Sequence, residues 1–354
     1  MKKLLAYYLK KRFHIVLILS AIMVTILTVF ISNINFIHNA PVWDQTYEHI
    51  IGYEPVAVNS PIGYLTVFSC LLATIVPLFE FYFKMKKISI DQQYSLPIKR
   101  EKLFLTKYIV GLFIILASLT IAYIWMIFIT SLKENIFNMG YIYLYYPVLI
   151  GLTSVLYTII CFVYTRANTF FDGLINILFY IFIFAIVLGI LNEWNLKVGE
   201  NWSWFFIYSP HTCADRIFIK LSENDPSSYK TIDLISMLFF TIVAIIFFIL
   251  FIILNKIDKS ENSMQISESY FSYKVMIPLY TILCSGLVVH SEGIILAFIF
   301  TGAYIMYATY KRTFKLSKKD ILILIIILVV SIIFAIISNE ISFTNNTIPP
   351  VIVK

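Results

Sequence analysis

The sequence is poor in charged residues. Asp, Glu, Lys and Arg make up 13% of its 354 residues, whereas hydrophobic residues make up 60%. A soluble domain is usually about half apolar and a quarter charged, so a water-soluble fold of this chain would lack charged side chains for its surface. The composition therefore excludes an ordinary soluble protein and indicates an integral membrane protein.

Cysteine and glycine are also scarce, with 4 and 11 residues. Cys70, Cys161 and Cys284 lie in apolar runs and only Cys213 lies outside them, so we predict no disulfide framework. No glycine-rich loop with a lysine is present to bind phosphate, which excludes ATP binding by that route. No apolar run carries GxxxG, so that motif gives no close helix dimerisation.

The five histidines form neither HExxH nor another metal-binding spacing. His211 and Cys213 are two potential metal ligands close together in sequence, but we interpret their spacing in a loop as coincidental. His290 and Glu292 are interpreted as a charge pair at an outer turn. We therefore predict no catalytic residue, no metal and no cofactor bound by this chain itself.

Long apolar runs are what the sequence has in abundance. Most are close to the roughly 20 residues that a helix needs to cross the hydrocarbon core. They are continuous rather than alternating, which favours helices over a barrel. We expect an all-α polytopic membrane fold of about nine spans, with a re-entrant pair and seven full spans as the alternative. The runs lie at 14–35, 61–83, 108–131, 143–164, 173–191, 233–254, 275–310 (two short crossings) and 320–338.

Lysine and arginine are distributed unevenly between the segments that separate these runs. With the N-terminus inside, 21 of them lie on inner segments and 6 on outer segments. The positive-inside rule then predicts a multi-pass protein of the cell membrane with a cytoplasmic N-terminus and an outer C-terminus. The first run is longer than a signal-peptide core and lacks a convincing cleavage site, so we expect it to be retained.

A polar stretch at 255–273 divides the chain. We expect a six-span transmembrane domain at 1–254, a cytoplasmic linker at 255–273 and an additional transmembrane region at 274–354. The chain begins with a basic amphipathic segment, in which Leu5, Leu9 and Phe13 recur every four residues. This pattern predicts a helix in the inner membrane interface, and simple basic flanking of the first span is the alternative.

The longest outer segment, 192–232, is rich in aromatic residues. Tryptophan favours the boundary between membrane and water, so we expect the segment to lie on or dip into the outer leaflet. An ordinary aromatic belt is the alternative. The residues concerned are Trp194, Trp202, Trp204, Phe205 and Phe206.

Charge within the spans is scarce, and Glu80 is the clearest case. Lys84 follows four residues later, so we predict an ion pair on one helix face near the inner membrane surface. A proton relay is the less favoured interpretation. The scarcity of buried charge argues against an ion-coupled carrier.

The stretch "YSLPIKREKLFLTKY", residues 94–108, joins the second run to the third. Pro97 suits the first turn of a helix, because its missing N–H would be unpaired there. Residues 88–95 have room for one or two helical turns. We predict a stiff elbow that leads without a break into the third span, and the topology already accounts for its basic residues, so nucleic acid is not a partner.

The segment "SLPIKREKLFLTKYIVGL" resembles the one after the second span of ABC exporter permeases of the ABC type-2 class. The basic amphipathic start, the six spans and the long outer segment agree with that resemblance, which covers about 1–254. The extra residues 255–354 depart from it.

The resemblance implies a permease subunit that works as a homo- or heterodimer with two separate ATPase chains, which bind ATP and Mg²⁺. The weakly charged, aromatic spans suggest an amphiphilic cargo such as a hydrophobic peptide, an antimicrobial or a lipid. An ion-coupled secondary transporter and a non-transporting sensor or accessory subunit are the alternatives. The resemblance assigns ATPase coupling to Ile88, Asp91, Gln92, Tyr94, Leu96, Pro97, Lys99, Arg100 and Lys102.

Overall fold

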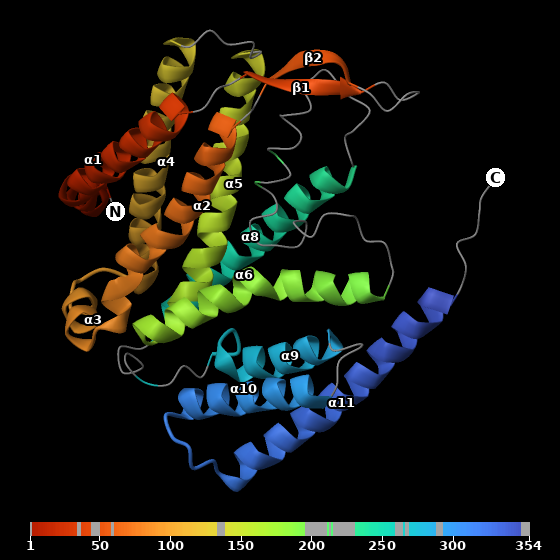
Figure 1. Ribbon diagram of the computed structural model, residues 1–354. Helices are drawn as coiled ribbons and strands as arrows, with labels where there is room; N and C mark the ends of the chain where they lie inside the picture. Colours follow the sequence, from red (N-terminus) through yellow and green to blue (C-terminus); the bar gives the residue numbers. More distant parts are fainter. Residues whose placement is uncertain are drawn as a thin grey trace. The chain divides into compact units, whose positions relative to one another are not determined.

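The fold is predominantly helical (Figure 1). A computed structural model describes residues 2–33, 37–43, 50–57, 60–132, 139–194, 211, 214, 231–258, 265, 269–287 and 293–347. Within these residues, six helices are long and apolar enough to cross a membrane. They are α1 (Lys2–Asn33), α2 (Ser60–Phe81), α4 (Arg100–Leu132), α5 (Met139–Thr165), α8 (Thr231–Ile257) and α11 (Lys318–Thr347).

Three further apolar segments bear on the predicted total of about nine spans. α6 (Phe170–Glu193) has 24 residues, α9 (Tyr273–Gly286) has 14 and α10 (Gly293–Lys311) has 19. At 1.5 Å per residue, α9 is about 21 Å long, which is shorter than the roughly 30 Å hydrocarbon core. The helical membrane class is confirmed, and the total of nine remains a prediction.

One element departs from the all-α prediction. β1 (Ile37–Trp43) and β2 (Ile50–Ala57) form an antiparallel pair that runs from Ile37 opposite Ala57 to Trp43 opposite Ile50. Both strands contain a proline, and a two-stranded pair tolerates this because each strand is an edge that leaves one side of its backbone unpaired. The sequence alone predicts only an outer segment here.

The chain forms two compact units, and each is assembled from separate stretches. The first comprises Met1–Glu80, Lys99–Ile159 and Pro210–Ile252. The second comprises Phe81–Ile98, Ile160–Ser209 and Ile253–Lys354. The region after 254 therefore belongs to the same unit as α6 and the segment after α2.

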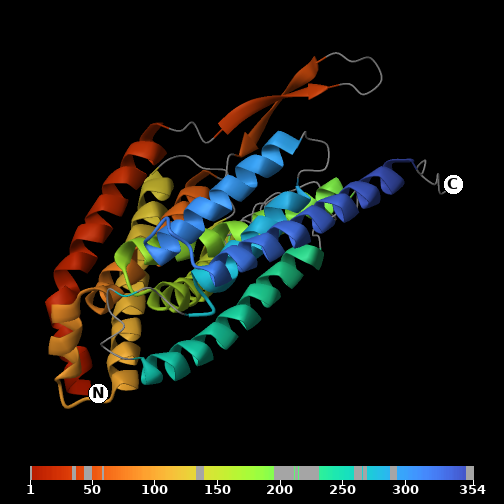
Figure 2. The ribbon, with the colours of Figure 1, turned by 90° about the horizontal axis from the view of Figure 1, so that it is seen from below.

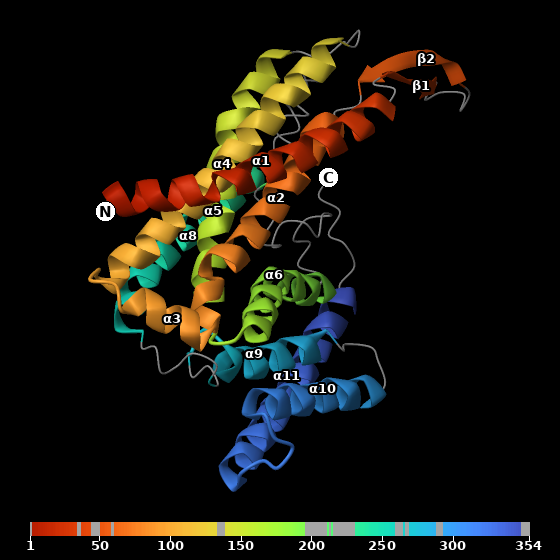
Figure 3. The same cartoon turned by 90° about the vertical axis from the view of Figure 1, so that its left-hand side faces the viewer.

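In the first unit, α1 packs against α4 (Figure 3). The indole N–H of Trp125 on α4 donates to the Thr28 hydroxyl of α1 at 2.9 Å. The buried side chains of α1 recur at helical spacing, so one stripe faces the unit. They are Tyr8, Val16, Ser20, Met23, Leu27 and Ile31.

α5 is the most deeply buried of the six candidate spans. Its Tyr145 hydroxyl lies 2.6 Å from that of Thr66 on α2, and its Thr158 hydroxyl lies 2.7 Å from that of Tyr108 on α4. In lipid the hydrophobic effect does not drive helices together, and hydrogen bonds between side chains are one of the forces that do. These contacts fix α5 against both neighbours.

In the second unit, α9 packs against α6, α10 and α11 (Figures 1 and 2). α6 holds the start of α9 through polar contacts one helical turn apart. The Tyr273 hydroxyl donates to Asp172 at 3.0 Å, and the Ser272 hydroxyl donates to Asn176 at 3.1 Å. The C-terminal region is thus joined to α6 by specific hydrogen bonds as well as apolar contact.

Candidate functional site

The segment predicted to couple to an ATPase forms a defined elbow, residues Tyr82–Ile98, in the second unit. It begins with the short 3₁₀ helix η1 (Tyr82–Met85), continues through α3 (Lys87–Tyr94) and ends in a turn before α4. The 3₁₀ helix is a tighter, shorter form that often ends an α-helix. The predicted one or two helical turns between the second and third runs are confirmed as α3.

α3 is buried on one side and exposed on the other. Its Ile90 is 1% exposed, whereas Ile88 is 77% exposed, and Asp91 and Gln92 are exposed as well. Residues three and four apart share a helix face, so these three side chains form one outward surface. Tyr94, at the end of the helix, is half-buried. Three of the four predicted coupling residues of α3 are therefore accessible together.

Pro97 does not begin the next helix, and this part of the prediction is wrong. The Ile98 N–H donates to the Leu96 carbonyl at 2.7 Å, which closes a tight turn around Pro97. α4 begins three residues later, at Arg100, after the Lys99 carbonyl has accepted the first helical hydrogen bonds. A proline disfavours the helical conformation of the residue before it, which also explains why α3 ends at Tyr94.

The remaining predicted coupling residues lie in that turn or at the start of α4. Leu96, Pro97, Lys99 and Lys102 are exposed, and Arg100 is half-buried. The elbow and the third span are joined by this turn rather than by a continuous helix.

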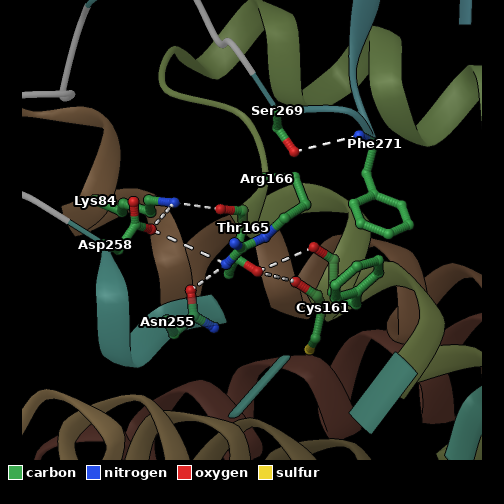
Figure 4. A network of polar contacts seen from close by, with 9 residues as sticks. Lys84, Cys161, Thr165, Arg166, Asn255, Asp258, Ser269 and Phe271 are labelled. Atoms are coloured by element: carbon green, nitrogen blue, oxygen red, sulfur yellow. Dashed lines mark hydrogen bonds and ion pairs between the residues drawn. The ribbon is translucent and has the colours of Figure 1, made fainter. Parts of the chain in front are cut away.

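A buried polar cluster anchors the start of the elbow (Figure 4). Lys84 of η1 forms an ion pair with Asp258, just after α8, and donates to the backbone carbonyl of Thr165 at the end of α5. The side chain of Lys84 is 4% exposed and that of Asp258 is 11% exposed. The cluster therefore ties the elbow to the ends of two apolar helices within the second unit.

Arg166 completes this cluster. It donates to the side-chain carbonyl of Asn255, and its guanidinium lies 4.0 Å from Asp258. Burial lowers the pKa of Arg166 from its usual value, while Asp258 and then Tyr94 partly offset this by favouring the charged form.

A second buried cluster, in the first unit, surrounds Glu80. Its carboxylate lies 3.0 Å from Arg12 on α1 and 3.8 Å from Lys107 on α4. The Lys107 ammonium also lies 4.1 Å from the ring centre of Tyr8, where a cation–π attraction adds to the ion pair. The cluster links α1, α2 and α4 near the predicted inner ends of these helices.

The predicted ion pair between Glu80 and Lys84 is therefore wrong in its partners. The pairing at i and i+4 requires an α-helix through both residues, but α2 ends at Phe81 and η1 follows. Glu80 pairs instead with residues of α1 and α4, and Lys84 with Asp258. In each cluster one carboxylate lies between two cations.

The first residues of the chain are helical, as predicted, but they belong to a longer element. α1 runs without interruption from Lys2 to Asn33, so the predicted interfacial segment is its N-terminal part (Figure 2). Leu5 and Leu9 are half-buried and Phe13 is 55% exposed. Their position in the membrane interface remains a prediction.

Of the predicted aromatic outer segment, Trp194 lies within the described residues. It follows α6, and its indole N–H donates to the Ser338 hydroxyl of α11 at 2.7 Å. Its ring also meets that of Phe334 edge to face, with centres 6.2 Å apart. Trp194 thus contributes to helix packing, while Trp202, Trp204, Phe205 and Phe206 lie outside the described residues.

Other candidates for chemistry are few in the described part of the chain. His211 is buried, and burial lowers its pKa to about 4, so its imidazole is neutral at pH 7. Cys213, His290 and Glu292 lie outside the described residues. Within those residues, no group of three or more His, Cys, Asp or Glu side chains is placed to hold a metal ion.

Sequence reasoning missed five residues of the two clusters, namely Arg12, Lys107, Arg166, Asn255 and Asp258. Each lies at the predicted inner end of an apolar run, which is a weak signal because polar residues are usual there. Arg166 and Asn255 are 89 positions apart, so their contact depends on the tertiary fold. Their shared location at the predicted cytoplasmic ends of the runs was the only available clue.

The fold and the apolar helices define the chain as a helical membrane protein. Comparisons with protein-family models, with curated proteins and with solved structures find no match.

Proposed function

We propose that this chain is the membrane permease subunit of an ATP-driven ABC exporter. Two permease chains and two separate ATPase chains would form the transporter in the cell membrane, with the transport path between the permeases. The ATPase chains would bind ATP and Mg²⁺. In this proposal the chain crosses the membrane about nine times, with its N-terminus in the cytoplasm and its C-terminus outside.

The observation that carries the proposal is the construction of α3. Its outward face presents Ile88, Asp91 and Gln92, while Ile90 and the preceding Phe83 are buried. A partner that presses on this face acts on a helix with a fixed base. Such a helix transmits a displacement to the spans, whereas a flexible linker absorbs it. This arrangement supports a role for the elbow in receiving force from an ATPase.

Co-purification of the full chain with any ABC ATPase that a neighbouring gene is found to encode tests this proposal. Ile88→Asp places a charge in the centre of the proposed contact, and we expect it to reduce the co-purified ATPase at least about tenfold, as loss of a central apolar contact does at protein interfaces. Phe314→Asp is the matched control, because Phe314 is 75% exposed in another predicted cytoplasmic segment.

The control should retain the ATPase. The proposal fails if no ATPase co-purifies with the unaltered chain, or if Arg100→Glu combined with Pro97→Gly leaves ATP-driven transport intact.

The proposed cargo is amphiphilic, such as a hydrophobic peptide, an antimicrobial or a lipid. Aromatic residues make up 17% of the chain and charged residues only 13%, which favours contact with apolar molecules that carry a polar part. Uptake of a fluorescent hydrophobic peptide into inverted vesicles, compared with uptake of a hydrophilic peptide of equal length, tests this preference.

An ion-coupled secondary transporter is the second candidate, and the buried charges favour it. Glu80, Lys84 and Lys107 are each at most 3% exposed, and buried ionisable residues in membrane helices often serve ion or proton pathways. This candidate predicts that an uncoupler abolishes transport while ATP depletion does not. The opposite pattern supports the ABC exporter, and the absence of any transport supports a sensor or accessory subunit.

A further inference from the structure

Asp258 occupies a distinctive position in the second unit. It follows the last residue of α8 and lies between two buried cations, Lys84 and Arg166 (Figure 4). The cluster also supplies neutral oxygens to both cations, because Arg166 donates to Asn255 and Lys84 donates to the Thr165 carbonyl. One carboxylate therefore pairs with two like charges that repel each other in a poorly hydrated environment.

The same cluster holds the segment just before α3. Lys84 lies three residues before α3 begins, in a stretch of η1 where Phe83 and Met85 are also buried. The outward face of α3 is exposed, while the segment that leads into it is buried and is paired with Asp258 through Lys84.

We infer that Asp258 is a positioning residue that latches α3 in place. We call Lys84, Arg166, Asn255 and Asp258 the Asp258 latch. Through it, the region after 254 regulates the elbow, because that region supplies Asn255 and Asp258. The holding of α3 stands on the contacts alone, whereas its consequence for ATPase coupling rests on the proposed function.

Loss of the latch should therefore leave ATPase binding intact but disconnect ATP hydrolysis from movement of the permease. The latch residues are largely buried and none of them belongs to the exposed face of α3, so their loss leaves the docking surface of the ATPase in place. A released α3 moves with the ATPase without carrying the ends of α5 and α8 with it. The ATPase then remains bound, but the permease no longer changes its rate of hydrolysis.

Hydrogen exchange of the full-length chain in lipid nanodiscs tests the latch without any partner. We expect Asp258→Asn to speed amide exchange in residues 87–94 about tenfold or more, because local opening governs exchange of a surface helix. Asp258→Glu keeps the negative charge and should restore most of the protection.

Asp320→Asn is the matched control. Asp320 pairs with Lys311 at 3.3 Å, and its side chain is 13% exposed, close to the 11% of Asp258. This variant removes a comparable ion pair from the turn between α10 and α11, so exchange of residues 87–94 should not change.

A second variant keeps the test decisive if Asp258→Asn folds poorly. Lys84→Met with Asp258→Asn removes one cation together with the carboxylate, which relieves the repulsion of Arg166. If the pair acts as a latch, exchange of residues 87–94 in the double variant is no faster than in Asp258→Asn, because the two substitutions disrupt the same interaction. Unchanged exchange in both variants overturns the latch.

The ATPase readout separates the latch from the proposed function. With the co-purified complex in proteoliposomes, Asp258→Asn should retain the ATPase, unlike Ile88→Asp, and should abolish the difference between the hydrolysis rates of bound and free ATPase. If Asp258→Asn retains the ATPase and the hydrolysis rates of bound and free ATPase still differ as in the unaltered complex, the regulatory role of the latch is overturned. If no ATPase binds the unaltered chain, the proposed function fails and the exchange experiment alone decides the latch.

Discussion

Glu80 and Asp258 are acids that each lie between two cations, in separate units of the fold. Burial of an ion pair does not by itself make a fold more stable, because desolvation offsets the attraction. Loss of one partner is different, since it leaves charge buried without compensation. The two carboxylates are therefore the residues at which a minimal change should have the largest effect.

Glu80→Gln should destabilise the chain by about 3 kcal/mol, because it leaves Lys107 buried without its carboxylate while keeping the shape of the side chain. Arg12 adds less to this effect, since its side chain is 27% exposed and is partly screened by solvent. The midpoint of thermal unfolding of the purified chain in detergent measures the change.

Glu101→Gln is the control for that substitution. Glu101 is a half-buried acid in the first turn of α4, where a carboxylate contributes about 0.3–1 kcal/mol through the helix dipole. Equal shifts of the unfolding midpoint in the two variants would contradict the importance of the Glu80 cluster.

At the scale of elements, the contact between α4 and α5 depends on a glycine. Gly111 lies where a Cβ would overlap the Tyr157 hydroxyl, which donates to the Tyr108 carbonyl at 3.0 Å. The small residue lets the tyrosine of one helix reach the backbone of the other. Close approach at small residues is a common basis of helix packing in membranes.

Gly111→Ala should therefore destabilise the chain by about 1–3 kcal/mol, since the added methyl group displaces a buried side chain. Gly151→Ala on α5 is the matched control, because within the described residues nothing beyond its chain neighbours and its own helix backbone lies within 4 Å of the Cβ it would add. Alanine is also favoured over glycine in a helix by up to about 1 kcal/mol, so the control should be neutral or stabilising. The midpoint of thermal unfolding should fall for Gly111→Ala and stay the same or rise for Gly151→Ala, and an equal fall in both variants would refute the packing argument.

At the scale of the whole molecule, the second unit combines three stretches that are distant in sequence. The region after 254 supplies the partners of Lys84 and Arg166, and its α9 packs against α6. A six-span domain at 1–254, which the sequence predicts, would keep these two cations and lose both Asn255 and Asp258.

Truncation after residue 254 should accordingly prevent proper folding, because it removes Asn255 and Asp258 from two buried cations and uncovers the face of α6 that contacts α9. Size-exclusion chromatography of the truncated chain in detergent should show aggregation instead of a single symmetric peak. Truncation after residue 347 is the control and should behave like the full chain. A monodisperse and stable 1–254 fragment would instead establish that the six-span region folds independently.

Composition and hydropathy are sufficient to predict the helical membrane class. Apolar runs of about 20 residues can satisfy their backbone hydrogen bonds in lipid only as helices or closed barrels, and this constraint is local to each run. α3 is similarly predictable, because Pro97 limits it on one side and the end of an apolar run limits it on the other. The strands β1 and β2 are not predictable in this way, since their pairing joins two segments without strong alternation.

The amino-acid sequence by itself determined that this protein is a helical membrane protein with a short helix between its second and third apolar runs. The tertiary structure alone decided which charges meet. The change from α-helix to 3₁₀ helix after Phe81 ends the regular spacing on which the pairing of Glu80 with Lys84 depends. Burial then directs each charge to a partner on another helix, because a charge removed from water needs an opposite charge or a hydrogen bond within reach, and the fold determines which one is near.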